Sequence, residues 1–356
     1  MDKMNICKVL TVVAAASVLA ACGPRESNEG ASCVLPVRMS EAVSLKESVS
    51  SVHVIALQDS LATQFPGSVS KVVWSGDSIF VLDTWKAPGV YLYTSDGVPS
   101  ASYTRKGNGP EEFVGLSDFE VTASEVVLLD SYSSAVRLHL DRQFSFLRKE
   151  AAEEQSAHAV SVGKGVWYDR GNVAYGENKD KLVYREGGQR QPVLPVPEEL
   201  ANVTFGSRHA FARVSADTVL YLPSVEPRLY KCYDGRAEVL CEFDFGGLWP
   251  EFSKMEGKDN PLSLMRSVAE GGKIYGTELF SDGTLLALSF FCRENLYVYL
   301  FSYPQLKAGG LLEVKKEDLS SLGSLVALTD GCLVFGEPGK LLKCRVKWPR
   351  PLLCMR

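Results

Sequence analysis

Few side chains in this sequence have the types and spacing needed for acid–base, nucleophilic or metal chemistry. The chain of 356 residues contains only four histidines, which are His53, His139, His158 and His209. None of them stands at metal-ligand spacing from another, and no CxxC pair is present. The sequence also lacks GxSxG, HExxH and P-loop motifs. It therefore offers no ready-made nucleophile, zinc site or phosphate cradle.

Two aspartates, Asp83 and Asp130, end strands that occupy equivalent places in a repeat. They could be metal ligands in a central channel, or they could cap turns by accepting backbone N–H groups. Because the residue recurs at the same point of successive repeats, we favour the capping role.

A second group of ionisable residues falls on strands that we expect to line a channel. Glu120 and Glu278 are the candidate channel carboxylates, with Arg208, His209 and Arg213 nearby. A hard cation such as calcium needs several oxygen ligands around one position. Since this group is mixed in sign, we predict no metal site and no cofactor, and calcium binding remains the alternative.

Short strands separated by turn residues must position these side chains. Asp96-Gly97 lies between two apolar runs, which is a strong hairpin signal because both turn residues need φ > 0. Residues 69–113 contain four such strands, at 71–74, 79–82, 90–93 and 100–104.

The four-strand unit repeats. Residues 116–149 follow the same order, and weaker copies span about 157–197, 208–245 and 273–314. A period of roughly 45 residues with four strands is typical of a β-propeller blade. The last segment, 322–347, supplies only three strands, so the isolated strand 52–57 is expected to complete that blade. The predicted fold is all-β, a six-bladed propeller closed by an N-terminal strand.

The linker GNGPEEF after the first unit carries a family resemblance. It is similar to the linker of NHL-like and TolB-like six-bladed propellers, above all to a group found as lipoproteins in Bacteroidetes, with the pattern G-x-G-P-G-E-[FY]. Glu111 stands where that pattern has glycine. The resemblance covers about residues 50–150 and implies fold and cell compartment, but little about activity. The matching residues are Gly107, Gly109, Pro110, Glu112 and Phe113.

The N-terminus has the features of a bacterial lipoprotein. Residues 1–21 are predicted to be a signal peptide, since their apolar run, 9–19, is too short to span a membrane as a stable helix. Leu-Ala-Ala-Cys ending at Cys22 matches a lipobox, so we expect lipid on Cys22. Residues 22–45 are predicted to be a flexible tether and 46–356 the propeller. The expected location is the outer membrane or cell surface, facing the periplasm or the exterior.

The sequence allows two strand registers for the hairpin that carries Cys332 and Cys344. A three-residue loop would place the cysteines directly opposite each other, within disulfide range. A two-residue Pro-Gly loop would shift the register by one residue and place them on opposite faces.

Function is expected to lie in the connections between blades. The long connection 246–272 contains Trp249 and Phe252, our candidate partner-binding residues together with Arg208 and His209; the alternative is a lid that only covers the ring. The net charge of −5 does not indicate the basic surface that nucleic-acid binding requires. We expect a membrane-anchored, non-enzymatic binding module for a protein, peptide or glycan. The alternative is a calcium-dependent propeller hydrolase or lyase of the lactonase-like type.

Overall fold

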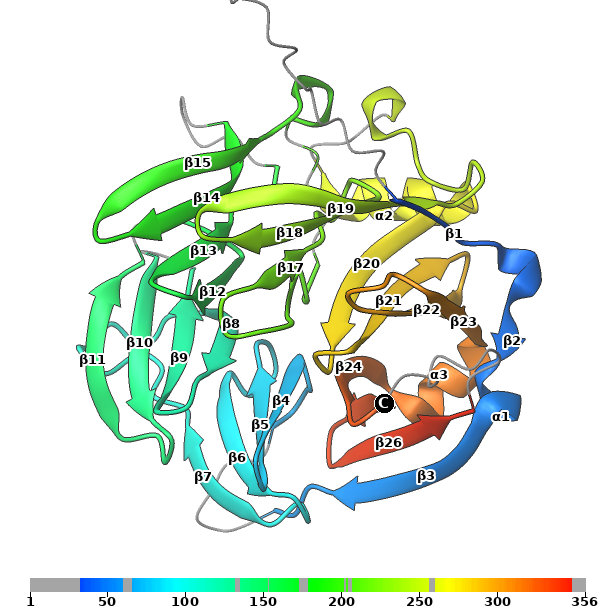
Figure 1. Cartoon of the computed structure of the whole chain (residues 1–356). Coiled ribbons are helices and arrows are strands. Elements are labelled where there is room, and N and C mark those ends of the chain that lie inside the picture. The colour runs from blue at the N-terminus through cyan, green and yellow to red at the C-terminus, as the bar shows by residue number, and fades with distance from the viewer. Residues whose placement is uncertain are drawn as a thin grey trace, which may run out of the picture. The chain divides into compact units, whose positions relative to one another are not determined.

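Six β-sheets surround a common axis in the computed structural model (Figure 1). The described residues, which begin at Cys33, belong to one compact unit. The structure describes residues 33–59, 66–131, 135–152, 154–172, 179–201, 203, 207–255 and 260–347.

The first three blades are antiparallel four-stranded sheets, each running from an inner to an outer strand. Blade 1 is β4 (Lys71–Ser75), β5 (Ser78–Asp83), β6 (Gly89–Thr94) and β7 (Pro99–Tyr103). Blade 2 is β8 (Leu116–Val121), β9 (Glu125–Asp130), β10 (Val136–Asp141) and β11 (Phe146–Ala151). Blade 3 is β12 (His158–Val162), β13 (Gly165–Asp169), β14 (Asp180–Glu186) and β15 (Gln189–Pro195). The four strands predicted for the first unit are confirmed as β4 to β7.

The last three blades continue the pattern. Blade 4 is β16 (Phe211–Arg213), β17 (Val219–Tyr221), β18 (Arg228–Tyr233) and β19 (Arg236–Asp244). Blade 5 is β20 (Ile274–Ser281), β21 (Leu285–Cys292), β22 (Asn295–Ser302) and β23 (Ala308–Val314). Blade 6 has β24 (Ser324–Thr329), β25 (Cys332–Glu337) and β26 (Lys340–Val346). Short helices lie in the connections: η2 (Glu198–Leu200), η3 (Phe252–Lys254), α2 (Pro261–Glu270) and α3 (Lys316–Leu322).

The ring closes as predicted. Strand β3 (Val49–Ala56) pairs antiparallel with β26, with Val52 opposite Cys344 and Ile55 opposite Leu341. Blade 6 therefore gains its fourth strand from the N-terminal part of the chain.

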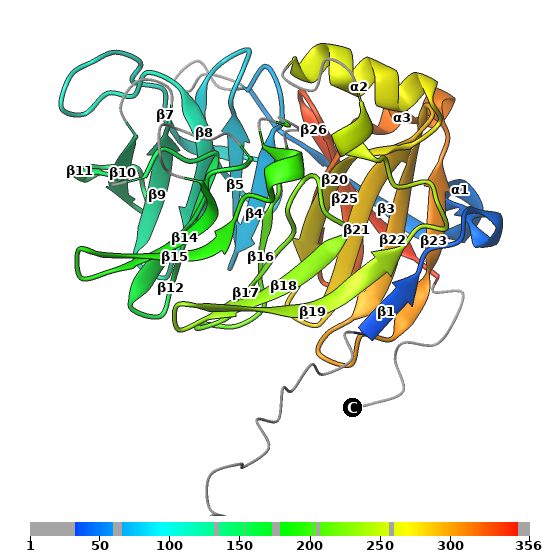
Figure 2. The same cartoon turned by 90° about the horizontal axis from the view of Figure 1, so that it is seen from above.

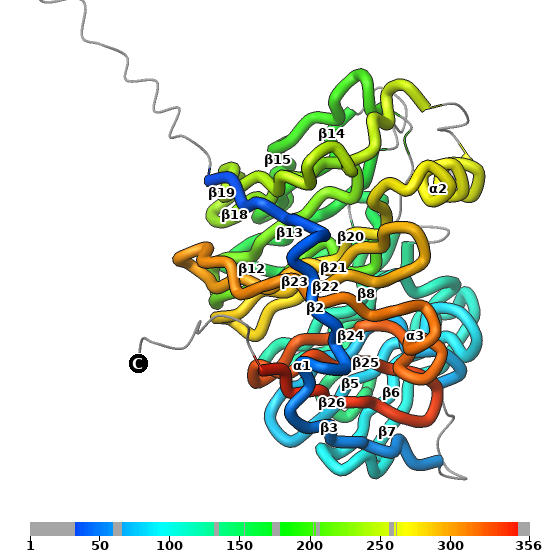
Figure 3. The backbone as a smooth tube through the Cα atoms, turned by 90° about the vertical axis from the view of Figure 1, so that its right-hand side faces the viewer, coloured from blue at the N-terminus to red at the C-terminus, as the bar shows by residue number. Residues whose placement is uncertain are grey.

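Part of the segment predicted as a tether is instead folded. Strand β1 (Cys33–Pro36) runs parallel to β19 of blade 4, and β2 (Val43–Ser44) runs parallel to β23 of blade 5. Between them lies η1 (Met39–Glu41), and α1 (Leu45–Ser48) leads into β3. We call residues 33–56 the N-terminal strap; it crosses the outer edges of blades 4, 5 and 6 (Figure 3).

The strap is held by a few buried apolar side chains. Leu35 and Val37 join the core between blades 4 and 5, and Leu45 joins the core between blades 5 and 6. Such sparse apolar residues among Gly, Pro, Ser and Glu resemble a linker in the sequence, which explains the missed strands.

The hairpin of blade 6 adopts the two-residue turn. Glu337 pairs with Lys340, so Cys332 faces Arg345 and Cys344 faces Leu333. The two cysteines therefore point to opposite faces, and both are buried free thiols. The facing register that would have allowed a disulfide is not adopted.

Among the described residues, no helix is both long enough and apolar enough to cross a bilayer.

Candidate functional site: the central channel

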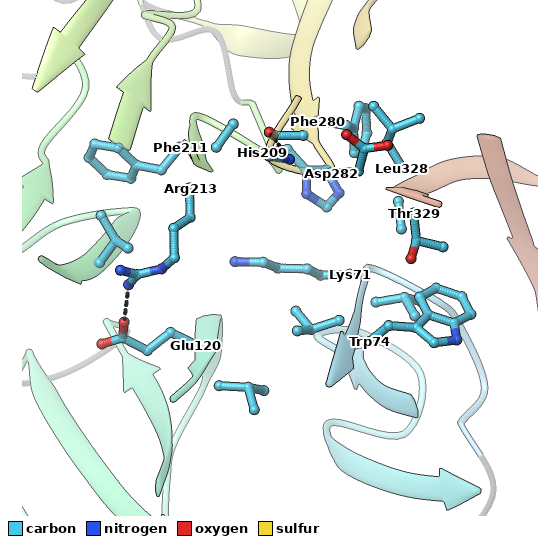
Figure 4. A pocket seen from close by; sticks show the side chains of 18 of the residues that line it. Lys71, Trp74, Glu120, His209, Phe211, Arg213, Phe280, Asp282, Leu328 and Thr329 are labelled. Atoms are coloured by element: carbon cyan, nitrogen blue, oxygen red, sulfur yellow. Dashed lines mark hydrogen bonds and ion pairs between the residues drawn. The ribbon is translucent and has the colours of Figure 1, made fainter. Parts of the chain in front are cut away.

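The inner strands of all six blades enclose a cavity of about 550 Å³ on the ring axis (Figure 4). Its lining starts at Lys71, Asp118 and His209, near the beginnings of inner strands. It reaches hairpin residues at the opposite end, such as Ser215 and Asp330. The cavity thus runs from a polar floor to the end of the ring where the first two strands of each blade are joined.

The floor is a chain of polar contacts that spans four blades. The Lys71 ammonium donates to Asp118 Oδ1 at 2.6 Å and to the carbonyl of Phe119 at 2.9 Å. Asp118 Oδ2 lies 3.4 Å from His158 Nδ1. His158 Nε2 donates to the carbonyl of Ser207 at 2.6 Å. Asp118 and His158 are both buried.

The protonation of this chain follows from its partners. Burial tends to raise the pKa of Asp118, but the charges of Lys71 and His158 and their hydrogen bonds hold it well below its usual range. Burial tends to lower the pKa of His158, but the hydrogen bond and charge of Asp118 leave it raised above its usual 6.5. Since both ring nitrogens of His158 face acceptors, we assign it as an imidazolium held by an ionised Asp118.

His209 has the opposite environment. Burial comes first, and the positive charges of Lys71 and Arg208 add to it, so its pKa lies well below 6.5. Its ring packs on Phe280 with centroids 4.5 Å apart. Within the described part of the chain, its buried Nε2 has no hydrogen-bond partner. His209 is therefore a neutral imidazole with unused hydrogen-bonding capacity beside the cavity.

Glu120 lies on the wall and is neutralised there. It pairs with Arg137 at 3.0 Å and with Arg213 at 3.4 Å, and it accepts from the backbone N–H and hydroxyl of Ser161. The Arg213 side chain is 39% exposed and reaches from β16 to Glu120 along one side of the cavity (Figure 4).

The other two candidates flank the cavity. Arg208 pairs with Glu278 at 2.7 Å, beside a smaller pocket between blades 5 and 6. The structure thus brings His209 and Glu120 to the main cavity, while Arg208 and Glu278 lie next to it. In the described residues, no group of three or more His, Cys, Asp or Glu side chains could hold a metal ion.

The comparisons agree with this architecture. The family DUF5128, described as a 6-bladed beta-propeller, matches residues 25–320. The chain belongs to this family.

Solved structures extend the comparison. This DUF5128 propeller resembles a protein of Bacteroides fragilis described as exported, with 14% identity and a TM-score of 0.72, over 88% of this chain and 99% of that one. It also resembles a DUF4221 family member from Bacteroides vulgatus, with 7% identity and a TM-score of 0.58, over 83% and 96% of the two chains. At these identities the likeness concerns the fold alone. No curated protein matches the chain.

Asp83 and Asp130 cap turns in the DUF5128 propeller, as favoured from the sequence. Asp83 accepts from the backbone N–H groups of Trp85, Lys86 and Ala87, among others. Asp130 accepts from those of Val114 and Gly115. Asp83 thus fixes the turn between β5 and β6 and, by accepting from the Ser68 N–H, also the start of β4, while Asp130 fixes the turn before β8. Neither residue lines the main cavity.

The long connection is packed more tightly than the partner-binding hypothesis required. Phe252, one of the candidate partner-binding residues, is only 3% exposed, so it does not present a contact surface. Trp249 stacks on Phe245 and contacts Phe252 edge-on. Both belong to a cluster formed with α2, because an isolated loop of this length needs its own apolar contacts. The exposed apolar side chains of the segment are instead Leu262 and Met265.

Sequence reasoning missed most of the channel floor of this DUF5128 propeller. Lys71, Asp118 and His158 were not singled out together, and Lys71 and Asp118 were given no role. The available signal was positional: each lies near the start of the first strand in consecutive repeats.

Proposed function

We propose that this protein is a membrane-anchored, extracytoplasmic binding module without catalytic activity, which uses one end of its ring to bind a protein, peptide or glycan partner. The lipobox at Cys22 supports the membrane anchor. The likeness to an exported Bacteroides protein is consistent with export.

One observation carries the proposal. Large apolar side chains are exposed in connections on the end of the ring where the inner strands begin: Trp85 is 78% exposed, Leu262 is 74% and Met265 is 44%. Trp85 follows the end of β5, which is antiparallel to β4, and Leu262 and Met265 lie on α2, directly before β20 (Figure 2). Aromatic residues and methionine are enriched at protein interfaces.

The helix that presents two of these side chains is well fixed. The Asn260 side chain caps α2 by accepting from the N–H groups of Leu262 and Ser263 at 3.1 and 3.2 Å. Leu264 and Val268 on its inner face are buried. A surface held in this way loses little conformational entropy on binding.

The chemistry of the ring favours binding over hydrolysis. Asp118, Glu120 and Glu278 are all engaged by cationic side chains. A calcium-dependent enzyme would need such carboxylates free to surround one ion.

The test is a quantitative pull-down from native membranes with the wild type and the double variant Leu262→Glu, Met265→Glu. The control is Leu147→Glu on β11, where Leu147 is 47% exposed. We expect partners recovered by the wild type and the control to be lost by the double variant. Equal recovery by all three proteins, with unchanged melting temperatures, would contradict this binding surface.

A further inference from the structure

Two cationic side chains extend into the central cavity from facing blades (Figure 4). Asp118 and the Phe119 carbonyl accept two of the three N–H bonds of the Lys71 ammonium. Arg213 uses its Nη2 atom toward Glu120 and the carbonyl of Ser161. One ammonium proton and the other guanidinium nitrogens are not engaged by hydrogen bonds within the described residues, so each cation retains donors for a ligand.

His209 adds an independent indication of a ligand. It is 6% exposed, lines the same cavity, and its Nε2 atom has no partner among the described residues. A buried polar atom left unpaired is costly, so native proteins pair such atoms with protein, water or ligand. A ligand atom beside Phe280 and Lys71 would satisfy it.

The carboxylates that line the cavity already accept hydrogen bonds or form ion pairs within the protein. Asp282 accepts from the backbone N–H groups of Leu285 and Gly331, and from Thr284. Asp330 pairs with Lys343 at 2.6 Å. The lining itself carries two cations and four carboxylates. The charges nearly balance only because Arg137, His158 and Lys343 pair with three of these carboxylates from outside the lining. The hydrogen-bonding groups left over in the cavity are therefore mainly donors. Such a site suits a monoanion better than a dianion.

The remaining lining is apolar and aromatic. Trp74, Phe211, Phe280 and Leu328 border the polar positions. The volume of about 550 Å³ lies within the usual range for small-molecule sites.

We propose that the central cavity binds a small organic acid, a monocarboxylate with an apolar or aromatic body. Lys71 and Arg213 hold the carboxylate, with the His209 Nε2–H as a third donor. The body lies against either Trp74 or Phe211, which stand on opposite sides of the cavity (Figure 4). This site goes beyond the partner-binding role proposed above and lies away from α2, since the two are reached from opposite ends of the inner strands.

The test uses 3-phenylpropionate and indole-3-acetate as probes, titrated into the full-length protein by ligand-observed NMR. At least one of them is expected to bind with a dissociation constant of about 1 mM or lower. The matched neutral compounds, 3-phenylpropanamide and indole-3-acetamide, are expected to bind at least about tenfold more weakly. Failure of both acids to bind, equal binding of acid and amide, or tighter binding of phenyl phosphate would each overturn the proposal.

Variants locate the site. Arg213→Gln removes the partly exposed cation but leaves Glu120 paired with Arg137 within blade 2 and bonded to Ser161 of blade 3, so these two blades remain linked. We expect it to weaken binding of the acid by roughly tenfold to a hundredfold and to leave the amide unaffected. The control is Arg228→Gln. Arg228 pairs with Glu242 on the outer part of blade 4, so this variant should bind the acid as tightly as the wild type does. Unchanged binding by folded Arg213→Gln would refute this location. The membrane pull-down does not depend on this result, so failures of the two proposals are distinguishable.

Discussion

Replacing Asp118 by Asn tests whether the charged floor of the channel holds neighbouring blades together. Asn keeps the shape but removes the charge that pairs with Lys71 at 2.6 Å and faces His158 at 3.4 Å. Breaking a buried pair on one side costs about 3–5 kcal/mol. Because the Lys71 side chain keeps 22% exposure, we expect a loss near the lower limit, about 3 kcal/mol, with a fall of about 6 °C in melting temperature.

The pH dependence separates this mechanism from a general packing defect. The pKa of His158 is raised in the native protein, so the stability it contributes is complete below about 6.5 and declines as pH rises through the folded pKa. In Asp118→Asn the charge that raises the pKa of His158 is absent. The fall in stability with rising pH is therefore lost as well. The difference between wild type and Asp118→Asn should therefore be larger at pH 6 than at pH 9.

Urea unfolding followed by tryptophan fluorescence at the two pH values measures both effects. Asp244→Asn is the control, since Asp244 forms an exposed ion pair with Arg38 of the strap and should contribute far less. A free energy of unfolding for Asp118→Asn within about 1 kcal/mol of the wild type at pH 6 would refute the reasoning. So would an identical loss at pH 6 and pH 9.

Three further predictions concern other parts of the chain. A Cβ on Gly97 would lie 2.0 Å from the carbonyl oxygen of Ala56 on β3, whereas a Cβ on Gly76 meets nothing. Both glycines have positive φ. Gly76→Ala should therefore lower the free energy of unfolding in urea by about 1 kcal/mol, and Gly97→Ala should lower it clearly more. Equal losses would show that the contact between Gly97 and Ala56 is not tight. Metabolic labelling with an alkyne fatty acid should tag the wild type, while equal labelling of Cys22→Ala would exclude lipidation there. Mass spectrometry of the unreduced, alkylated protein should find the thiols of blade 6 free, and a disulfide between them would contradict the observed register.

The strand content and the ring closure were accessible from the sequence because both depend on local patterns. Alternating apolar residues and Asp-Gly turns such as Asp96-Gly97 define strands within a few residues. The count of three strands in the last blade then required a fourth from elsewhere. Strands β1 and β2 escaped prediction because each is short and pairs with a strand more than 200 residues later, so no local signal marks them.

The channel site was only partly predictable. Of the two expected channel carboxylates, Glu120 lines the cavity and Glu278 lies beside it, and His209, expected nearby, is in the lining. The repeat made this possible because it indicates which strand of each blade lies innermost. Their partners could not be deduced in the same way. Whether Lys71 meets Asp118 depends on the bulge at the start of β8 and on the angle between blades, neither of which the strand pattern specifies. The burial of Phe252 likewise depends on how one loop packs on another.

The strap also governs when folding can finish. Strand β3 pairs with β26, whose residues lie about 290 positions further along the chain. At equilibrium this distance matters little: closing so long a loop costs only about 2 kcal/mol more than closing a single repeat. The rate of folding is affected much more, because β1 and β2 have no partners until blades 4 and 5 have been synthesised, and β3 has none until the last blade has been synthesised. Contacts of such high sequence separation slow folding. The ring should thus be completed only after the whole chain is available, with the open edges of blades 4, 5 and 6 exposed to aggregation until then.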